Sequence, residues 1–138
     1  CFWGPEKKYG QLEGIYRTEV GYCGGNSPNT NYREVCTGTT NHAEAVKLEF
    51  DPKVITYEQI IKKFFEFHDP TTLNSQGPDF GTQYRSEIFY LNDEQKNIAQ
   101  KIINEENLRL SGKVVTKLSE LRNYCTAEEY HQKYLEKR

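Results

Sequence analysis

The first three residues of the chain place a thiol, Cys1, beside two large aromatic side chains, Phe2 and Trp3. Pro5 follows closely and suits the first turn of a helix, where a missing backbone N–H costs nothing. A thiol in that turn lies near the partial positive charge of the exposed N–H groups, which favours the reactive thiolate form. Cys1 is therefore a candidate nucleophile, although position alone is equally consistent with a buried, unreactive thiol.

Glu44 is the second residue whose position suggests chemistry. The segment AEAVKLEF alternates as a half-buried strand, and the alternation places Glu44 on the apolar face. A carboxyl group that burial keeps protonated near neutral pH can donate a hydrogen bond to an oxygen that gains charge during a reaction. The alternative is that the strand end is exposed and the carboxylate reaches solvent.

Further candidates lie in loops rich in glycine and other turn-forming residues: Tyr32, Asp79 and Tyr84. Tyrosines in such loops usually pack as amphipathic anchors, and the ten tyrosines of this chain make each one weak evidence by itself. His42 and His68 are candidates for a metal ligand or for a base that activates the thiol. A single histidine at the end of an element is more often a capping or surface residue.

The composition indicates a single soluble domain. With 138 residues the chain can bury one hydrophobic core but is short for two domains. Its 18 basic and 20 acidic residues give a net charge of -2 and form no long run of one sign. No stretch approaches the roughly 20 apolar residues of a membrane span. We therefore expect a monomer with neither nucleic acid nor a membrane as partner.

The four cysteines, Cys1, Cys23, Cys36 and Cys125, are too few for a disulfide-dense scaffold. They form no C-x-x-C pair, and the histidines lie far from any cysteine pair, so no zinc site is expected. These features favour a reducing, cytoplasmic compartment. Because the chain does not begin with methionine, we expect that sequence before Cys1 is missing, together with any targeting leader.

Hydrophobic periodicity predicts the elements that must position these residues. Helices are predicted in four places: from about Cys1, over 56–68, over 93–110 and from Thr126 onwards. The second and the last begin with capping boxes, T-x-x-Q from Thr56 and T-x-x-E from Thr126. Strands are predicted over 15–22, 43–50, 82–91 and 113–121. Several connections are short, which favours an α+β fold over a doubly wound parallel sheet. The expected architecture is a two-layer α/β sandwich with a mixed, mostly antiparallel sheet.

Four stretches together resemble the peptide methionine sulfoxide reductase A family: CFWG, NYREVCTGTTNHAEAV, HDPTTLNSQGPDFGTQYRS and AEEYHQKYL. They follow the family's order through nearly the whole chain. The resemblance implies one catalytic domain over residues 1–138 with a ferredoxin-like core, and with sequence missing before and after it. It also implies a repair enzyme that binds no cofactor and reduces methionine S-sulfoxide, free or in peptides.

The resemblance assigns a role to each candidate residue. It places the nucleophile on Cys1 and the aromatic wall that receives the substrate's methyl group on Phe2 and Trp3. The remaining roles are an acid, two hydroxyls for the sulfoxide oxygen and a polar partner, and they fall on Glu44, Tyr32, Tyr84 and Asp79. In this scheme the thiolate attacks the sulfoxide sulfur, methionine leaves, and Cys1 becomes a sulfenic acid.

In this family a second cysteine and thioredoxin normally reduce the sulfenic acid, and dithiothreitol can replace them. Many relatives carry recycling cysteines in a tail after the YHQKYL helix, but this chain ends at Arg138 without one. Cys125 and Cys23 are therefore the candidate resolving cysteines, ahead of Cys36, which occupies a family position not used for recycling. Direct reduction by an external thiol is the remaining alternative.

Two functions of other kinds also fit the residues. In an N-terminal-nucleophile amidase, Cys1 would attack a carbonyl with its own α-amine as the base. In a non-catalytic binding module, Phe2, Trp3 and the tyrosines would form an aromatic pocket for a partner's side chain. A sulfenic acid on Cys1 after addition of a methionine sulfoxide peptide would exclude the binding module. Activity of a chain extended upstream of Cys1 would argue against the amidase.

Overall fold

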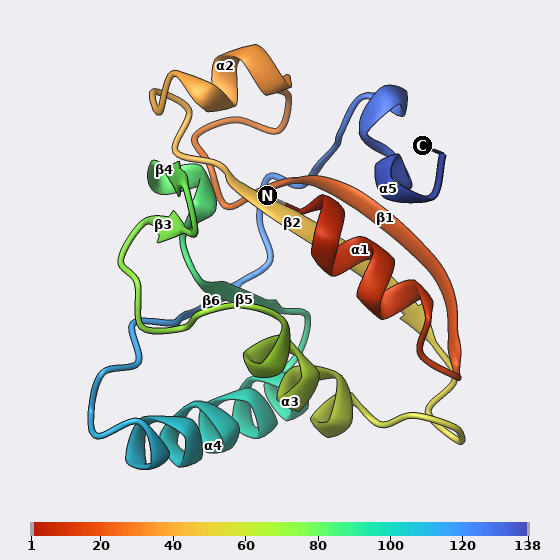
Figure 1. Ribbon diagram of the computed structural model, residues 1–138, viewed down its shortest axis with the longest axis vertical. Helices are drawn as coiled ribbons and strands as arrows, with labels where there is room; N and C mark the ends of the chain where they lie inside the picture. Colours follow the sequence, from red (N-terminus) through yellow and green to blue (C-terminus); the bar gives the residue numbers. More distant parts are fainter. Residues whose placement is uncertain (1, 138) are drawn as a thin grey trace.

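A long antiparallel pair of strands forms the frame of the fold in the computed structural model, which describes residues 2–137. Strand β1 (Ile15–Cys23) pairs with β2 (Ala43–Phe50) along its whole length. The short β7 (Cys125–Thr126) joins the other edge of β1. Helix α1 (Trp3–Gly10) packs against β1, and Figure 1 shows it running along the strand pair.

A second core lies between two helices and a parallel strand pair. Helices α3 (Tyr57–Phe67) and α4 (Asp93–Arg109) pack together beside β5 (Glu87–Tyr90) and β6 (Lys117–Glu120). Their contact is made by buried apolar side chains: Ile61, Phe65, Ile88, Ala99 and Ile102. The burial of this apolar surface is the main stabilising contribution of the second half of the chain.

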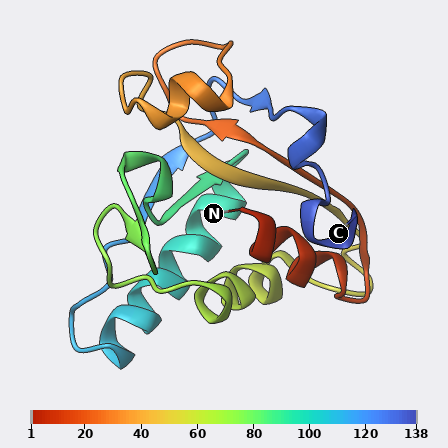
Figure 2. The ribbon, with the colours of Figure 1, turned by 45° about the horizontal axis from the view of Figure 1, so that its top comes forward.

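Short elements carried by loops surround the start of the chain. They are α2 (Tyr32–Cys36), the hairpin of β3 (Ser75–Gln76) and β4 (Asp79–Phe80), the 3-10 helices η1 (Thr82–Tyr84) and η2 (Glu129–His131), and α5 (Tyr134–Lys137). In Figures 1 and 2 the start of α1 lies between the hairpin on one side and α5 on the other. The loops thus deliver side chains to one region from distant parts of the sequence.

The α+β class is confirmed, and so are the two long helices. The helix predicted over 56–68 begins at a capping box, in which Thr56 and Gln59 each accept a hydrogen bond from the other's backbone N–H. Among residues 2–137 the strands fall into three separate sheets, two antiparallel and one parallel, where one mixed sheet was expected. Within the same residues no helix has the length and apolarity needed to cross a membrane.

Three predicted elements are wrong at their starts. The strand expected from Lys113 begins only at Lys117. The strand expected from Thr82 begins only at Glu87, because Thr82–Tyr84 form a 3-10 turn closed by the bond from the Tyr84 N–H to the Gly81 carbonyl. The final helix does not begin at Thr126. Thr126 instead pairs with Gly21 as part of β7. The edge of β1 thus takes this segment into a strand, although its capping pattern favours a helix.

Arg85 joins the second core to the strand pair. Its Nε donates to Glu87 Oε1 at 2.6 Å, and the two side chains are only 8% and 7% exposed. Its Nη1 and Nη2 donate to the carbonyls of Thr82 and Asn41 at 2.9 and 3.0 Å. Ser119 Oγ donates to the other oxygen of Glu87 at 2.6 Å. Arg85 therefore fixes both η1 and the turn that leads into β2.

Replacing Arg85 by alanine is expected to destabilise the protein by about 3–5 kcal/mol, because the buried Glu87 carboxylate would lose its cation. Arg109→Ala is the matched control, since Arg109 and Glu106 also lie 2.6 Å apart but at the surface. The control should cost less than about 1 kcal/mol. Urea denaturation measures both losses, and equal losses would contradict the structural role of Arg85.

Candidate functional site

A hydrogen bond joins the start of α1 to β2. The backbone N–H of Phe2 donates to Oε1 of Glu44 at 3.1 Å. Glu44 lies opposite Tyr22 in the β1–β2 ladder, so the bond places the residue after Cys1 on the face of the sheet that carries Glu44. Cys1 itself lies outside the described residues.

Glu44 is a carboxyl group whose protonation is shifted. Burial raises its pKa from 4.5 to about 7, the Phe2 N–H opposes the rise, and the charge of the nearby Asp79 adds to it. Near neutral pH a large fraction of the group is therefore the neutral acid, which donates a proton or a hydrogen bond. The alternation along the strand predicted that Glu44 lies on the less exposed face of β2, and it does.

The Tyr84 hydroxyl lies near this acid, and the Tyr32 hydroxyl lies near that of Tyr84. Burial raises the pKa of Tyr84, and the Glu44 and Asp79 carboxylates raise it further. The Tyr32 hydroxyl bonds to the Cys36 thiol, which together with burial raises the pKa of Tyr32, and it also contacts Tyr84. Both phenols therefore stay protonated as donors. The structure thus brings Tyr32, Tyr84, Asp79 and Glu44 together from α2, η1, β4 and β2.

The two aromatic residues after Cys1 form one continuous surface with the C-terminal segment. Phe2 is buried and contacts Tyr22 and His131 with ring centroids 5.9 and 5.4 Å apart. The Trp3 ring stacks on Tyr134 at 3.8 Å and 17°, and its Nε1 donates to His131 Nδ1 at 3.1 Å. These side chains make an apolar wall next to the polar cluster.

His131 is a site residue that the sequence analysis did not single out. It is buried, burial lowers its pKa, and its ring also contacts Tyr32 at 4.7 Å. Because Nδ1 accepts from Trp3, the neutral ring carries its proton on Nε2, which has no hydrogen-bond partner among the described residues. His131 lies in the AEEYHQKYL stretch, which carries the family resemblance. No hydrophobic periodicity or charge pattern in that stretch distinguishes the histidine from its neighbours.

The other two histidines have structural positions. His42 is buried under the Gly24–Gly25 turn and shares a hydrogen bond with the Ser27 carbonyl at 2.9 Å. His68 ends α3 and lies 2.7 Å from Ser86 Oγ. Residues 2–137 contain no group of side chains that could hold a metal ion.

The three described cysteines differ in how exposed their side chains are. Cys23 is buried, burial raises its pKa, and its thiol bonds to the Arg122 carbonyl. Cys36 is exposed. Cys125 is partly buried and bonds to the Thr30 carbonyl at 3.4 Å, and all three are free thiols.

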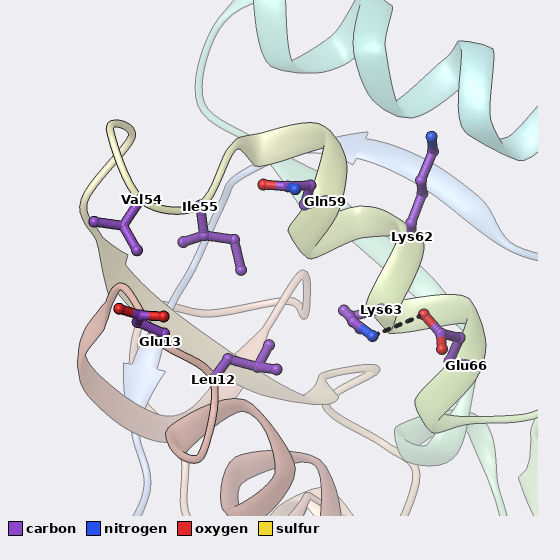
Figure 3. Close-up of a pocket in the computed structure, with 8 residues that line it drawn as sticks. All are labelled: Leu12, Glu13, Val54, Ile55, Gln59, Lys62, Lys63 and Glu66. Atoms are coloured by element: carbon purple, nitrogen blue, oxygen red, sulfur yellow. Dashed lines mark ion pairs between the residues drawn. The ribbon is translucent and has the colours of Figure 1, made fainter.

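A groove lies away from this site. It has a volume of about 310 Å³ and is formed by the loop after α1, the turn before α3 and α3 itself (Figure 3). Leu12 and Ile55 contribute apolar surface, and Lys63 and Glu66 form an ion pair at 3.4 Å beside them. None of the candidate residues described above lines this groove.

Known proteins match the chain over its whole length. The family model described as peptide methionine sulfoxide reductase matches residues 1–138. Peptide methionine sulfoxide reductase MsrA of Pelagibacter ubique is 71% identical over 138 residues, which is 100% of this chain and 94% of that protein.

Solved structures match as well. Mxr1 from Saccharomyces cerevisiae in reduced form superimposes with a TM-score of 0.94 at 42% identity, covering 100% of this chain and 81% of that one. Mxr1 in complex with Trx2 matches with a TM-score of 0.68 at 26% identity, covering 97% of this chain and 78% of that one.

The ¹³C chemical shift of the Glu44 carboxyl should titrate with a midpoint near pH 7, and Glu44→Gln should remove this titration. The folded protein holds a proton that the unfolded chain releases above about pH 4.5, so this group's contribution to stability falls as pH rises from 4.5 to about 7. Above that range the contribution is constant. A midpoint near 4.5 would show that Glu44 is not shielded from solvent.

Proposed function

The chain belongs to the peptide methionine sulfoxide reductase family, whose activity is the reduction of methionine sulfoxide, and we propose that it acts on the S epimer through Cys1. One observation carries the proposal. The Glu44 carboxyl, with its pKa raised to about 7, lies 3.1 Å from the backbone of the residue after Cys1 and beside two phenol donors. The residue next to the Cys1 thiol in the sequence is therefore hydrogen-bonded to a proton donor, Glu44.

In the first step the Cys1 thiolate attacks the sulfoxide sulfur while the oxygen of the substrate gains a proton. The S–O bond of the substrate then breaks as the oxygen moves to the Cys1 sulfur. The bond between the two sulfurs breaks at the same time, so methionine leaves and Cys1 becomes a sulfenic acid. The substrate sulfur gains two electrons and the Cys1 sulfur loses two. Neutral Glu44 supplies the proton, and the hydroxyls of Tyr32 and Tyr84 bind the oxygen as its charge grows.

The negative charge of Asp79 raises the pKa of Glu44 and so supports its acid form. Phe2 and Trp3 offer an apolar surface for the S-methyl group. Because methyl and oxygen occupy separate subsites on either side of the attacked sulfur, only one sulfur epimer presents both groups correctly. This separation supports selectivity for the S form.

In the second step a thiol reduces the sulfenic acid, and thioredoxin restores the enzyme. The solved complex of Mxr1 with Trx2 supports thioredoxin as the partner. Cys125 is the better supported resolving residue because it pairs with Tyr22, which in turn pairs with Glu44. Residues paired across antiparallel strands project to the same face. Cys23 follows Tyr22 directly and therefore projects to the opposite face.

Glu44→Ala is expected to lower kcat for methionine sulfoxide by about 10²–10³-fold, because the variant has no donor at the developing charge. Glu44→Gln keeps an N–H donor and should lose less. Turnover with dithiothreitol measures both, and Cys1→Ser is the inactive reference. Equal activity of the two Glu44 variants and the parent would remove the acid role from Glu44.

Cys125→Ser is expected to abolish the disulfide that forms after one turnover, while leaving the first release of methionine intact. Cys23→Ser is the matched control and should still form it. The backbones of Cys125 and Glu44 are separated by two strand spacings, roughly 10 Å. The segment that carries Cys125 must therefore move before a disulfide with Cys1 can form. Peptide mapping of the oxidised protein decides, and a Cys1–Cys36 or Cys1–Cys23 disulfide would contradict the assignment.

A further inference from the structure

We propose that Glu6 is a positioning residue for the methyl-binding wall, and that it holds Trp3 in place through the turn at Lys133 and the ring of Tyr134. The proposal rests on the proposed function for its consequence, the selectivity for a methyl group. Its structural part stands on contacts between α1 and the C-terminal segment. Figure 2 shows α5 next to α1.

Glu6 is a buried acidic residue in a helix segment whose other charged residues are exposed. It is 1% exposed, whereas its neighbours Lys7 and Lys8 are exposed. Its Oε1 accepts the backbone N–H of Lys133 at 2.7 Å, and its Oε2 accepts the Thr18 hydroxyl at 2.9 Å. Burying a carboxylate is costly unless hydrogen bonds satisfy it. Both oxygens are satisfied here, and one of them is used to hold the C-terminal segment.

Lys133 is the residue that needs this support. Its φ of 50° lies in the left-handed region, which costs free energy for a residue other than glycine. The hydrogen bond to Glu6 offsets that cost. Just before it, the side-chain amide of Gln132 accepts from the Val20 N–H at 3.0 Å and donates to the Val20 carbonyl at 2.9 Å. The segment is thus attached to β1 at one residue and to α1 at the next.

The left-handed turn determines where the following side chain goes. Tyr134 comes directly after Lys133, and its ring stacks on Trp3 at 3.8 Å. On the other side of the turn, His131 accepts the Trp3 N–H. Trp3 is therefore held on its face by Tyr134 and at its edge by His131.

This attachment is independent of the part of the site that handles oxygen. Phe2 and Glu44 are joined by their own hydrogen bond. The Phe2 carbonyl also accepts the backbone N–H of Glu6 at 3.0 Å, a helical bond that does not use the Glu6 side chain, whose bonds go to Thr18 and Lys133. Loss of Glu6 should therefore free Tyr134 and Trp3 without removing the acid. The expected consequence is a loss of discrimination between alkyl groups on the sulfoxide sulfur.

The test compares methionine S-sulfoxide with ethionine S-sulfoxide, which carries one more methylene. A well-shaped apolar pocket distinguishes such substrates by about tenfold or more in kcat/KM. Glu6→Leu removes both acceptors and should reduce this ratio to about threefold or less. Glu6→Gln keeps an acceptor for Lys133 and should retain the ratio. The ratio does not depend on the fraction of folded enzyme, so a merely destabilising effect would leave it unchanged.

A spectroscopic measurement tests the same contact without turnover. Trp3 is the only tryptophan of the chain, so its fluorescence reports on the wall alone. Emission should shift to longer wavelength in Glu6→Leu and stay unchanged in Glu6→Gln. Glu13→Leu, at an exposed position after α1, is the control and should match the parent in both measurements.

An unchanged ratio and unchanged emission in folded Glu6→Leu would overturn the proposal. Should that variant fail to fold, Lys133→Pro replaces it, since it removes the N–H that Glu6 accepts and cannot adopt the positive φ of the turn: a lowered ratio supports the role and a parental ratio contradicts it. If the parent reduces neither sulfoxide, the proposed function fails instead. The Trp3 emission of the variants then still decides whether Glu6 positions the ring.

Discussion

The site depends on the hydrogen bond between the Phe2 N–H and the Glu44 carboxyl. It spans 42 positions of sequence and joins the first turn of α1 to the start of β2. Without it the N-terminal residues would have no fixed relation to the buried acid. With it, Phe2 and Trp3 lie between two different environments, the polar cluster around Glu44 and the aromatic wall around Trp3.

The polar cluster and the wall have separate supports. Glu44 comes from the longest strand ladder, and Tyr84 sits on a 3-10 turn that Arg85 ties to β5 and to the residues before β2. The wall is completed by His131 and Tyr134, which arrive from the other end of the chain. A substrate with a polar oxygen and an apolar methyl group on one sulfur needs these two environments side by side. The fold supplies them from different elements, so each can be altered with limited effect on the other.

The sequence pattern predicted the long elements and the anomaly of Glu44 because both follow from local periodicity. The capping box at Thr56 is local as well, and it occurs as predicted. The similar pattern at Thr126 does not start a helix, because there the edge of β1 competes for the same backbone. Thr56 and Thr126 have similar local signals but different structures, because only Thr126 lies within reach of the edge of β1.

By itself the sequence determined the α+β class, the family, and the candidate residues Phe2, Trp3, Glu44, Tyr32 and Tyr84. These follow from alternation, motif and residue chemistry, which are properties of neighbouring positions. Only the tertiary structure decided how these residues are surrounded. It buries Glu44 and so raises its pKa, places Trp3 between His131 and Tyr134, and buries Glu6. The physical reason is that burial and hydrogen bonding depend on distances between segments that are far apart in the chain.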